Sequence, residues 1–193
     1  MSEIIKKKIK FTENNIKLLS KKFYSFDVET TGLNPVNDRI IEIGCCEFVN
    51  LQPVKIFQTL INAHHYIPHH VTKVNNITNE MLKEAPLEDE VYLYFCQFIK
   101  DVLDGRAIIV AHNATFDMNF LSNTLERLNI SGKLYYIDTL ELSRCYLNLC
   151  NNKQTTVANY FNIPIGNAHR AGDDALVCGK ILSCIINLKS EKN

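Results

Sequence analysis

Residues 23–35, FYSFDVETTGLNP, restrict the fold strongly because a strand and its abrupt end are encoded together. The aromatic and β-branched residues at 23–28 predict a strand, and the Thr, Gly, Asn and Pro residues that follow predict a turn. Asp27 and Glu29 stand at the end of this strand. Because they are two residues apart, both side chains lie on one face. Two neighbouring carboxylates repel each other, which favours a divalent cation between them, although an isolated pair of this kind is more often a solvated surface feature.

The apolar periodicity along the chain predicts an α/β fold with a mixed central β-sheet flanked by helices. Strands at residues 23–28, 40–49 and 54–61 follow one another with short polar breaks, as in an antiparallel meander. From residue 79 onward helical spacing dominates, and the strands RAIIVAHN and KLYYIDTL each lead into a helix, as in parallel βα units. Helices are expected near residues 115–128, 155–161 and 171–188.

Composition indicates one domain at residues 23–188, preceded by a basic N-terminal arm or short helix at 1–22 and followed by a C-terminal tail at 189–193. The 193 residues contain 21 Lys and Arg and 21 Asp and Glu, so net charge identifies no partner. Residues 1–22 hold seven lysines against two glutamates. This local excess suits a solvated helix or arm, and alternatively recruitment of a phosphate backbone.

Apolar runs and cysteine usage both predict a cytoplasmic protein. No apolar run is long enough to span a bilayer, and the lysine-rich start lacks the apolar segment of a secretory signal. The seven cysteines are odd in number, contain no C-x-x-C and stand mostly in apolar segments. They are therefore expected to be reduced, rather than paired in disulfides or bound to zinc.

Two later segments carry acids at the start of predicted helices. In IIVAHNATFDMNFL, Asp117 falls in the first turn of a helix, where complementing the helix dipole is sufficient to explain it. In HRAGDDALVCGKIL, His169 precedes Asp174 by five residues, and Asp173 or Asp174 could simply cap the helix. Each segment is therefore weak support for a site when taken alone.

Considered together, these acids and the pair on the first strand can reach one end of a compact sheet. Four converging carboxylates would raise one another's pKa values and destabilise the fold unless metal charge compensated them. The sequence therefore predicts a site for two divalent metal ions, Mg²⁺ or Mn²⁺, near Asp27, Glu29, Asp117 and Asp174.

The motifs D-x-E-T-T-G-L, H-N-x-x-F-D and H-R-A-x-x-D-A, in this order, resemble those of the DEDDh-type 3′→5′ exonucleases. This DnaQ-like family includes the proofreading epsilon subunit of bacterial DNA polymerase III and the PolC-type exonucleases. The resemblance spans residues 23–186, nearly the whole chain. It implies a ribonuclease H-like fold and identifies residues 23–188 as an exonuclease domain.

The resemblance also implies a role for each of five residues. Asp27, Glu29 and Asp174 would bind one metal ion, Asp27 would be shared with a second, and Asp117 would help to hold the pair. His169 would be the general base that takes a proton from the attacking water. Asp173 is not chosen, because the family's last acid stands five residues after the histidine.

By the same resemblance, several residues would contact the 3′-terminal nucleotide. These residues are Thr30, Thr31, Leu33, His70, Asn75, His112 and Phe116. For Phe116, a place in the core is an almost equal alternative. Asn76 replaces a glycine usual in the family, and an asparagine tolerates the left-handed backbone that this position would require. Asp138 and Thr139 match a family pattern but are interpreted as a strand end and helix cap.

The histidines at 64, 65, 69 and 70 do not predict a zinc site. Neighbouring residues of an extended segment point to opposite faces, so the four rings cannot converge.

The expected function is metal-dependent 3′→5′ hydrolysis of single-stranded or frayed DNA, which releases nucleoside 5′-monophosphates in proofreading or repair. An RNA-trimming enzyme of the ribonuclease T or oligoribonuclease kind is the alternative with the same residues. A catalytically inactive nucleic-acid-binding scaffold is less favoured, because all five polar residues are present. The chain ends soon after its last predicted helix, so at most weak association with a DNA polymerase is expected.

Overall fold

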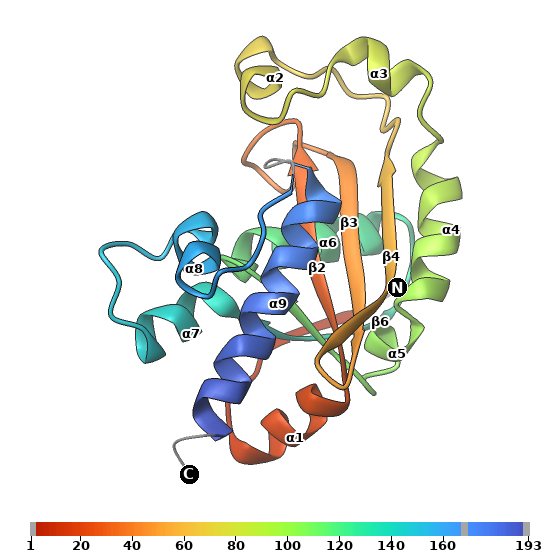
Figure 1. The fold of residues 1–193 in the computed structure, drawn as a ribbon. Coiled ribbons are helices and arrows are strands. Elements are labelled where there is room, and N and C mark those ends of the chain that lie inside the picture. The colour runs from red at the N-terminus through yellow and green to blue at the C-terminus, as the bar shows by residue number, and fades with distance from the viewer. Residues whose placement is uncertain (1–2, 167–169, 191–193) are drawn as a thin grey trace.

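The computed structural model describes residues 3–166 and 170–190, and over these residues the chain forms a six-stranded sheet with helices on both faces (Figure 1). The strands are β1 (Ile4–Lys8), β2 (Lys22–Thr30), β3 (Ile40–Val49), β4 (Gln52–Leu60), β5 (Ile108–Ala111) and β6 (Gly132–Asp138). The helices are α1 (Glu13–Lys21), α2 (His69–Asn75), α3 (Asn79–Lys83), α4 (Glu88–Phe98), α5 (Lys100–Leu103), α6 (Ala114–Arg127), α7 (Thr139–Tyr146), α8 (Gln154–Tyr160) and α9 (Ala171–Ser190).

The order of strands across the sheet is β1-β6-β5-β2-β3-β4. β2, β3 and β4 pair antiparallel, as expected for consecutive strands joined by short turns. β5 pairs parallel with β2, and β6 parallel with β5, each after a helical crossover. The predicted mixed sheet, an antiparallel meander followed by parallel βα units, is confirmed.

The segment expected to be a basic arm or short helix contributes a strand as well as a helix. β1 pairs parallel with β6, with Ile4 opposite Gly132 and Lys8 opposite Tyr136. Its sequence IIKKK lacks the alternation of a half-buried strand, and its lysines are exposed at the sheet edge, where lysine is common. Pairing with β6, which is distant in sequence, therefore decides this strand. The short helix of the prediction corresponds to α1.

Two apolar layers form, one on each face of the sheet. Phe26 of β2 packs with Phe95 of α4 on one face, together with residues of α6. On the other face Phe23 stacks on Phe48 with ring centroids 4.7 Å apart, under α9. The alternation of β2 thus buries both of its faces, and α9 lies diagonally across β2, β3 and β4 (Figure 1).

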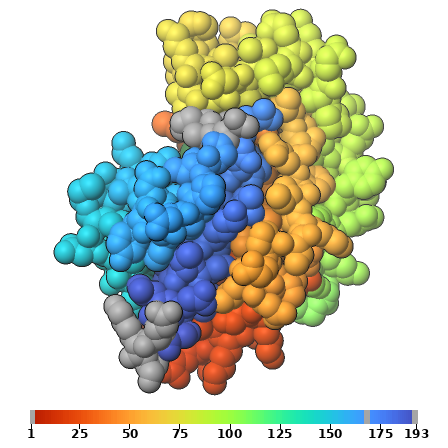
Figure 2. Space-filling model, viewed as in Figure 1, coloured from red at the N-terminus to blue at the C-terminus, as the bar shows by residue number. Residues whose placement is uncertain are grey.

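The α2–α3 segment forms a separate cap above the sheet end at which α9 begins (Figures 1 and 2). A small apolar cluster of Ile41, Ile67, Ile77 and Leu82 attaches this cap to β3. The cap therefore overhangs the end of β2 that carries Asp27 and Glu29.

The last helix, α9, runs past the expected end of the domain at residue 188. α9 continues to Ser190, so the tail expected at 189–193 starts inside a helix, and residues 191–193 lie outside the described residues. All seven cysteines are free; Cys145 and Cys150 are exposed, whereas Cys45, Cys46 and Cys178 are buried. Among the described residues, no helix has the length and apolar character needed to cross a membrane.

Candidate active site

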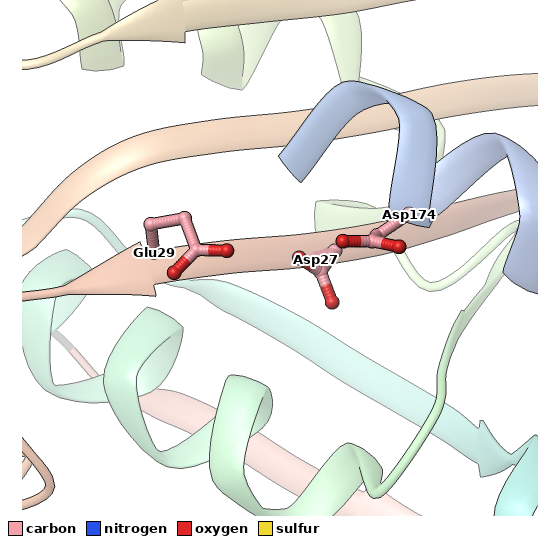
Figure 3. A group of neighbouring side chains, drawn as sticks. All are labelled: Asp27, Glu29 and Asp174. Atoms are coloured by element: carbon pink, nitrogen blue, oxygen red, sulfur yellow. The ribbon is translucent and has the colours of Figure 1, made fainter. Parts of the chain in front are cut away.

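β2 extends past the end of β5, and this overhang carries the first two acids. β5 pairs with β2 only between Phe23 and Ser25, whereas β3 follows β2 to Thr30. Asp27 and Glu29 lie opposite Gly44 and Glu42 of β3. Their side chains extend from one face of the strand, as the spacing predicts (Figure 3).

The third acid, Asp174, comes from the first turn of α9. Carboxylate oxygens of Asp27, Glu29 and Asp174 all lie within 4.8 Å of one another (Figure 3). This distance requires close contact between α9 and β3 at Gly44, because a Cβ there would stand 1.9 Å from the Ala171 carbonyl oxygen. A glycine opposite Asp27 therefore allows Asp174 to reach the strand.

The fourth acid, Asp117, is placed by a sharp turn between β5 and α6. Asn113 adopts the left-handed conformation, with φ 67°, and its amide donates to Asp138 Oδ1 at 3.0 Å. The same oxygen accepts from the amide of Leu140 at 2.9 Å, so Asp138 caps α7 as predicted. Asp117 is 3% exposed. The amide of Val28, in the part of β2 that extends past β5, donates to its carboxylate.

Burial and neighbouring carboxylates raise the pKa values of Asp27, Glu29 and Asp117. Burial raises the pKa of Asp27 well above its ordinary value, and Asp117, Asp174 and Glu29 raise it further. Burial, and then the charge of Glu42, raises the pKa of Glu29 to about 8. Burial also raises the pKa of Asp117.

A divalent cation fits this donor set. Carboxylate oxygens are the ligands that hard cations prefer, and a positive charge would reverse the pKa shifts that the acids impose on one another. Of the residues that the structure describes, Asp27, Glu29 and Asp174 are the group of His, Cys, Asp or Glu whose geometry could hold a metal ion. Asp173 and the histidines at 64, 65, 69 and 70 do not belong to this group.

An ion pair behind the site secures the start of α9. Glu42, fully buried on β3, accepts hydrogen bonds from Arg170 Nη2 at 2.8 Å and Nε at 3.0 Å. Gln58 Nε2 donates to the same carboxylate at 2.9 Å, and the Ala171 amide at 3.3 Å. Sequence reasoning missed Glu42, although an acid within the apolar run IIEIG was a usable signal.

The acids line a cleft of about 490 Å³. Its remaining lining residues are Val28, His112, Asn113, Phe116, Lys153, Gln154 and Thr155. The last three, at the N-terminal end of α8, were not identified from the sequence. Gln154 Nε2 donates to the carboxylate of Asp174 at 3.2 Å and to its carbonyl at 3.1 Å.

His112 and Phe116, predicted substrate contacts, both border the cleft. The ring nitrogens of His112 are occupied within the protein: Nδ1 lies 2.9 Å from Thr139 Oγ1, and Nε2 lies 2.9 Å from the Asn152 carbonyl oxygen. Burial lowers the pKa of His112. Phe116 packs on Phe120, with centroids 4.9 Å apart, and also lines the cleft, so substrate contact by this ring stays a prediction.

The turn after β2 uses both of its threonine hydroxyls internally. Thr30 Oγ1 donates to the Gly32 carbonyl at 2.6 Å. Thr31 is 1% exposed; its Oγ1 donates to Asp38 at 3.2 Å and accepts from the Arg39 amide at 3.0 Å. Leu33, at the tip of the turn, is 85% exposed. Of these three predicted contacts, the side chain of Leu33 is the accessible one.

The cap holds the remaining predicted contacts. His70 is exposed on α2. Residues 69–70 were expected to be extended, but they form the first turn of this helix, directly after Pro68. Asn75 is buried; its Oδ1 accepts from the Ile77 amide at 3.1 Å, and its side chain hydrogen-bonds Glu29 and lowers the pKa of that acid. Asn76 has φ 58°, the left-handed conformation expected of it. His169, the predicted base, lies outside the described residues.

Sequence comparison assigns most of the chain to one family. Residues 25–182 match the family model described as Exonuclease. The chain is 40% identical over 164 residues to a DNA polymerase III of PolC type from Caldanaerobacter subterraneus subsp. tengcongensis, covering 84% of this chain and 11% of that protein. It is 36% identical to the DNA polymerase III epsilon subunit of Treponema pallidum, covering 89% of this chain and 79% of that subunit. The chain thus spans about a tenth of its PolC-type relatives.

Solved structures share the fold. Exonuclease X, solved with 5′-overhanging duplex DNA, superposes with a TM-score of 0.67 at 22% identity, covering 87% of this chain and 93% of that one. Escherichia coli exonuclease I with a dT13 oligonucleotide gives a TM-score of 0.77 at 14% identity, covering 89% of this chain and 42% of that one. A zinc-bound form of the latter's complex with single-stranded DNA is also similar, with a TM-score of 0.74. The predicted ribonuclease H-like fold is confirmed.

The contact at Gly44 predicts a selective loss of metal binding. In Gly44→Ala, α9 must move away from β3, which increases the distance between Asp174 and Asp27. The affinity for Mn²⁺ should therefore fall about 10- to 100-fold, as it does when other residues that support metal ligands are changed. Overpacking should also lower the free energy of unfolding by about 1–3 kcal/mol. Titration calorimetry and denaturant unfolding measure the two effects.

Gly179→Ala is the matched control for this experiment. Its Cβ would stand 2.2 Å from the Phe48 ring, farther along α9. It should destabilise the protein while Mn²⁺ affinity stays unchanged. Equal losses of affinity in both variants would show that Gly44 has no special part in placing Asp174.

The raised pKa of Glu29 predicts how the stability of the metal-free protein depends on pH. The folded state holds the proton of Glu29 more tightly than the unfolded state does. Protonation of Glu29 therefore contributes to stability fully below the ordinary pKa of 4.5, and this contribution is lost as pH rises through about 8. In EDTA, the melting temperature should therefore fall over this interval, and less steeply in Glu29→Gln. Mn²⁺ should stabilise the protein more at the upper end. An identical pH dependence in the variant would contradict the prediction.

Proposed function

The chain belongs to the exonuclease family indicated by its motifs, and from this membership we propose that it is a metal-dependent 3′→5′ exonuclease. It would hydrolyse the terminal phosphodiester of single-stranded or frayed DNA and release nucleoside 5′-monophosphates. The observation that carries the proposal is the meeting of Asp27, Glu29 and Asp174 within 4.8 Å beside the buried Asp117.

The acids support dependence on divalent metal, and we propose that two ions, Mg²⁺ or Mn²⁺, are held. Asp27, Glu29 and Asp174 would hold one ion, Asp27 would be shared with the other, and Asp117 would help to hold the pair. When bound, such a pair activates water and stabilises charge on the leaving oxygen. The zinc-bound form of the exonuclease I complex supports metal binding by this fold.

His169 is proposed as the general base. It would accept a proton from the attacking water, whose oxygen bonds to phosphorus as the bond from phosphorus to the 3′ oxygen breaks. An imidazole has an ordinary pKa of about 6.5, which is suited to this transfer near neutral pH. The shortened strand is left with a 3′ hydroxyl, ready for another cycle.

Residues around the cleft would position the 3′ end. The exposed side chain of Leu33 and the ring of Phe116 offer apolar surfaces to an unstacked terminal base. We also propose roles for Thr30 and Thr31 through the turn they stabilise, and for Asn75 through its hydrogen bond to Glu29. His112 would act by holding the segment before α8, and His70 remains a proposed contact from the cap.

DNA is the proposed substrate because exonucleases X and I were solved with DNA and the sequence relatives are DNA polymerase III proteins. The role in proofreading or repair, and weak association with a DNA polymerase, are proposed on the same relatives. The inactive-scaffold alternative is disfavoured because all four acids and His169 are present.

Two variants separate metal binding from proton transfer. Asp27→Ala should remove Mn²⁺ binding and turnover but leave the fold intact, because it relieves repulsion among the acids. His169→Ala should retain Mn²⁺ affinity while kcat falls about 10²- to 10⁴-fold, the usual contribution of a general base. Calorimetry and single-turnover digestion measure these effects. Equal losses of Mn²⁺ affinity would contradict the division of roles, as would digestion that survives chelation.

Matched DNA and RNA oligonucleotides test the substrate. With Mg²⁺ or Mn²⁺, the protein should shorten 5′-labelled single-stranded DNA progressively from its 3′ end, and a 3′-phosphate block should slow it. RNA should be degraded more slowly if the site excludes the 2′-hydroxyl. Faster degradation of RNA would replace the DNA assignment with the RNA-trimming alternative, and failure on both substrates would favour the scaffold.

A further inference from the structure

One cation borders a cleft dominated by carboxylates. Among the described residues that line the cleft, Lys153 is the single lysine or arginine, facing the same space as Asp27, Glu29, Asp117 and Asp174. Its side chain is exposed, and within the described residues it forms no ion pair with these acids or with any others. The ammonium group is therefore available to a ligand in the cleft.

The backbone around Lys153 is fixed on both sides. On one side His112 Nε2 binds the Asn152 carbonyl at 2.9 Å, and on the other Gln154 binds Asp174 at 3.2 Å. The amide of Lys153 itself donates to Asn151 Oδ1 at 3.1 Å. Because a carbonyl oxygen only accepts, His112 carries its proton on Nε2, and its lowered pKa keeps this neutral form near pH 7. The backbone of Lys153 is thus held at a defined place beside the cleft.

A nucleic acid strand brings several negative charges to this cleft. Ions between the acids can neutralise the scissile phosphate, but the acids repel the phosphates that follow it along the strand. A cation on the rim compensates this repulsion without competing for the ion sites. Lysine is suited to this task, since its flexible stem allows a point charge to follow a phosphate.

We propose that Lys153 binds the phosphodiester immediately 5′ to the scissile one. The proposal rests on the exonuclease function and adds to it a second phosphate subsite. It makes Lys153 a substrate-binding residue whose effect depends on substrate length, because a dinucleotide has only the scissile phosphate and a trinucleotide has the second.

Turnover of oligothymidylates of two, three and eight nucleotides tests the subsite. In Lys153→Ala, KM for the three- and eight-nucleotide substrates should rise about three- to tenfold, the range expected for one exposed charge-assisted contact, with kcat nearly unchanged. Turnover of the dinucleotide should match that of the unmodified protein. Lys153→Arg should restore most of the lost affinity.

Salt dependence gives a second readout that does not require turnover. In the His169→Ala background with Mn²⁺, anisotropy of a labelled eight-nucleotide strand reports equilibrium binding. Loss of one phosphate contact should make the slope of log affinity against log salt shallower by about 0.7. Lys55→Ala removes the same charge from exposed edge strand β4, outside the cleft, and should change neither the slope nor KM.

Each outcome has a defined meaning. Normal KM and an unchanged salt slope in Lys153→Ala would overturn the subsite and leave the exonuclease function standing. An equal rise in KM for the dinucleotide would overturn it too, because the lysine would then act on the scissile group or on the fold. If the unmodified protein hydrolysed none of the three substrates, the proposed exonuclease activity on DNA itself would fail.

Discussion

Four carboxylates that repel one another meet at the end of β2. Asp27, Glu29, Asp117 and Asp174 come from three elements that are far apart in the chain, and the pKa values of the first three are raised by burial and by their neighbours. Left to electrostatics alone, these groups would separate. They stay together because β2, α6 and α9, which carry them, are packed in the apolar layers of the fold. The free energy of this packing offsets the repulsion among the acids, and a bound cation would reduce that repulsion.

Two local features turn this packing into a defined geometry. Gly44 lets the first turn of α9 approach β3 more closely than any side chain would permit. The buried Glu42, paired with Arg170, then fixes that turn from below. Such a pair adds little to net stability, because the desolvation of Glu42 offsets its attraction to Arg170. Its contribution lies in orientation, since it holds the residues immediately before Asp174.

The cleft therefore has acids at its base and a lysine on its rim. Metal ions at the base would cancel most of the negative charge, and Lys153 would extend positive potential along the path of a strand. An overall charge of zero is therefore no guide to the ligand that such a cleft would bind. What matters for a polyanion is the local order of charges around the cleft, which averages out over the whole chain.

The sequence was sufficient to predict most strands and helices and the acids of the candidate site, because strand and helix periodicity are local and the three motifs stand at element ends. It did not determine β1, whose lysine-rich segment becomes a strand only by pairing with β6. Nor did it show that the Thr31 hydroxyl is used by Asp38, that Glu42 supports α9, or that Lys153 faces the acids. Each of these features depends on contacts between segments that are distant in the sequence, and a local sequence pattern does not predict such contacts. They follow from the packing of the whole folded chain.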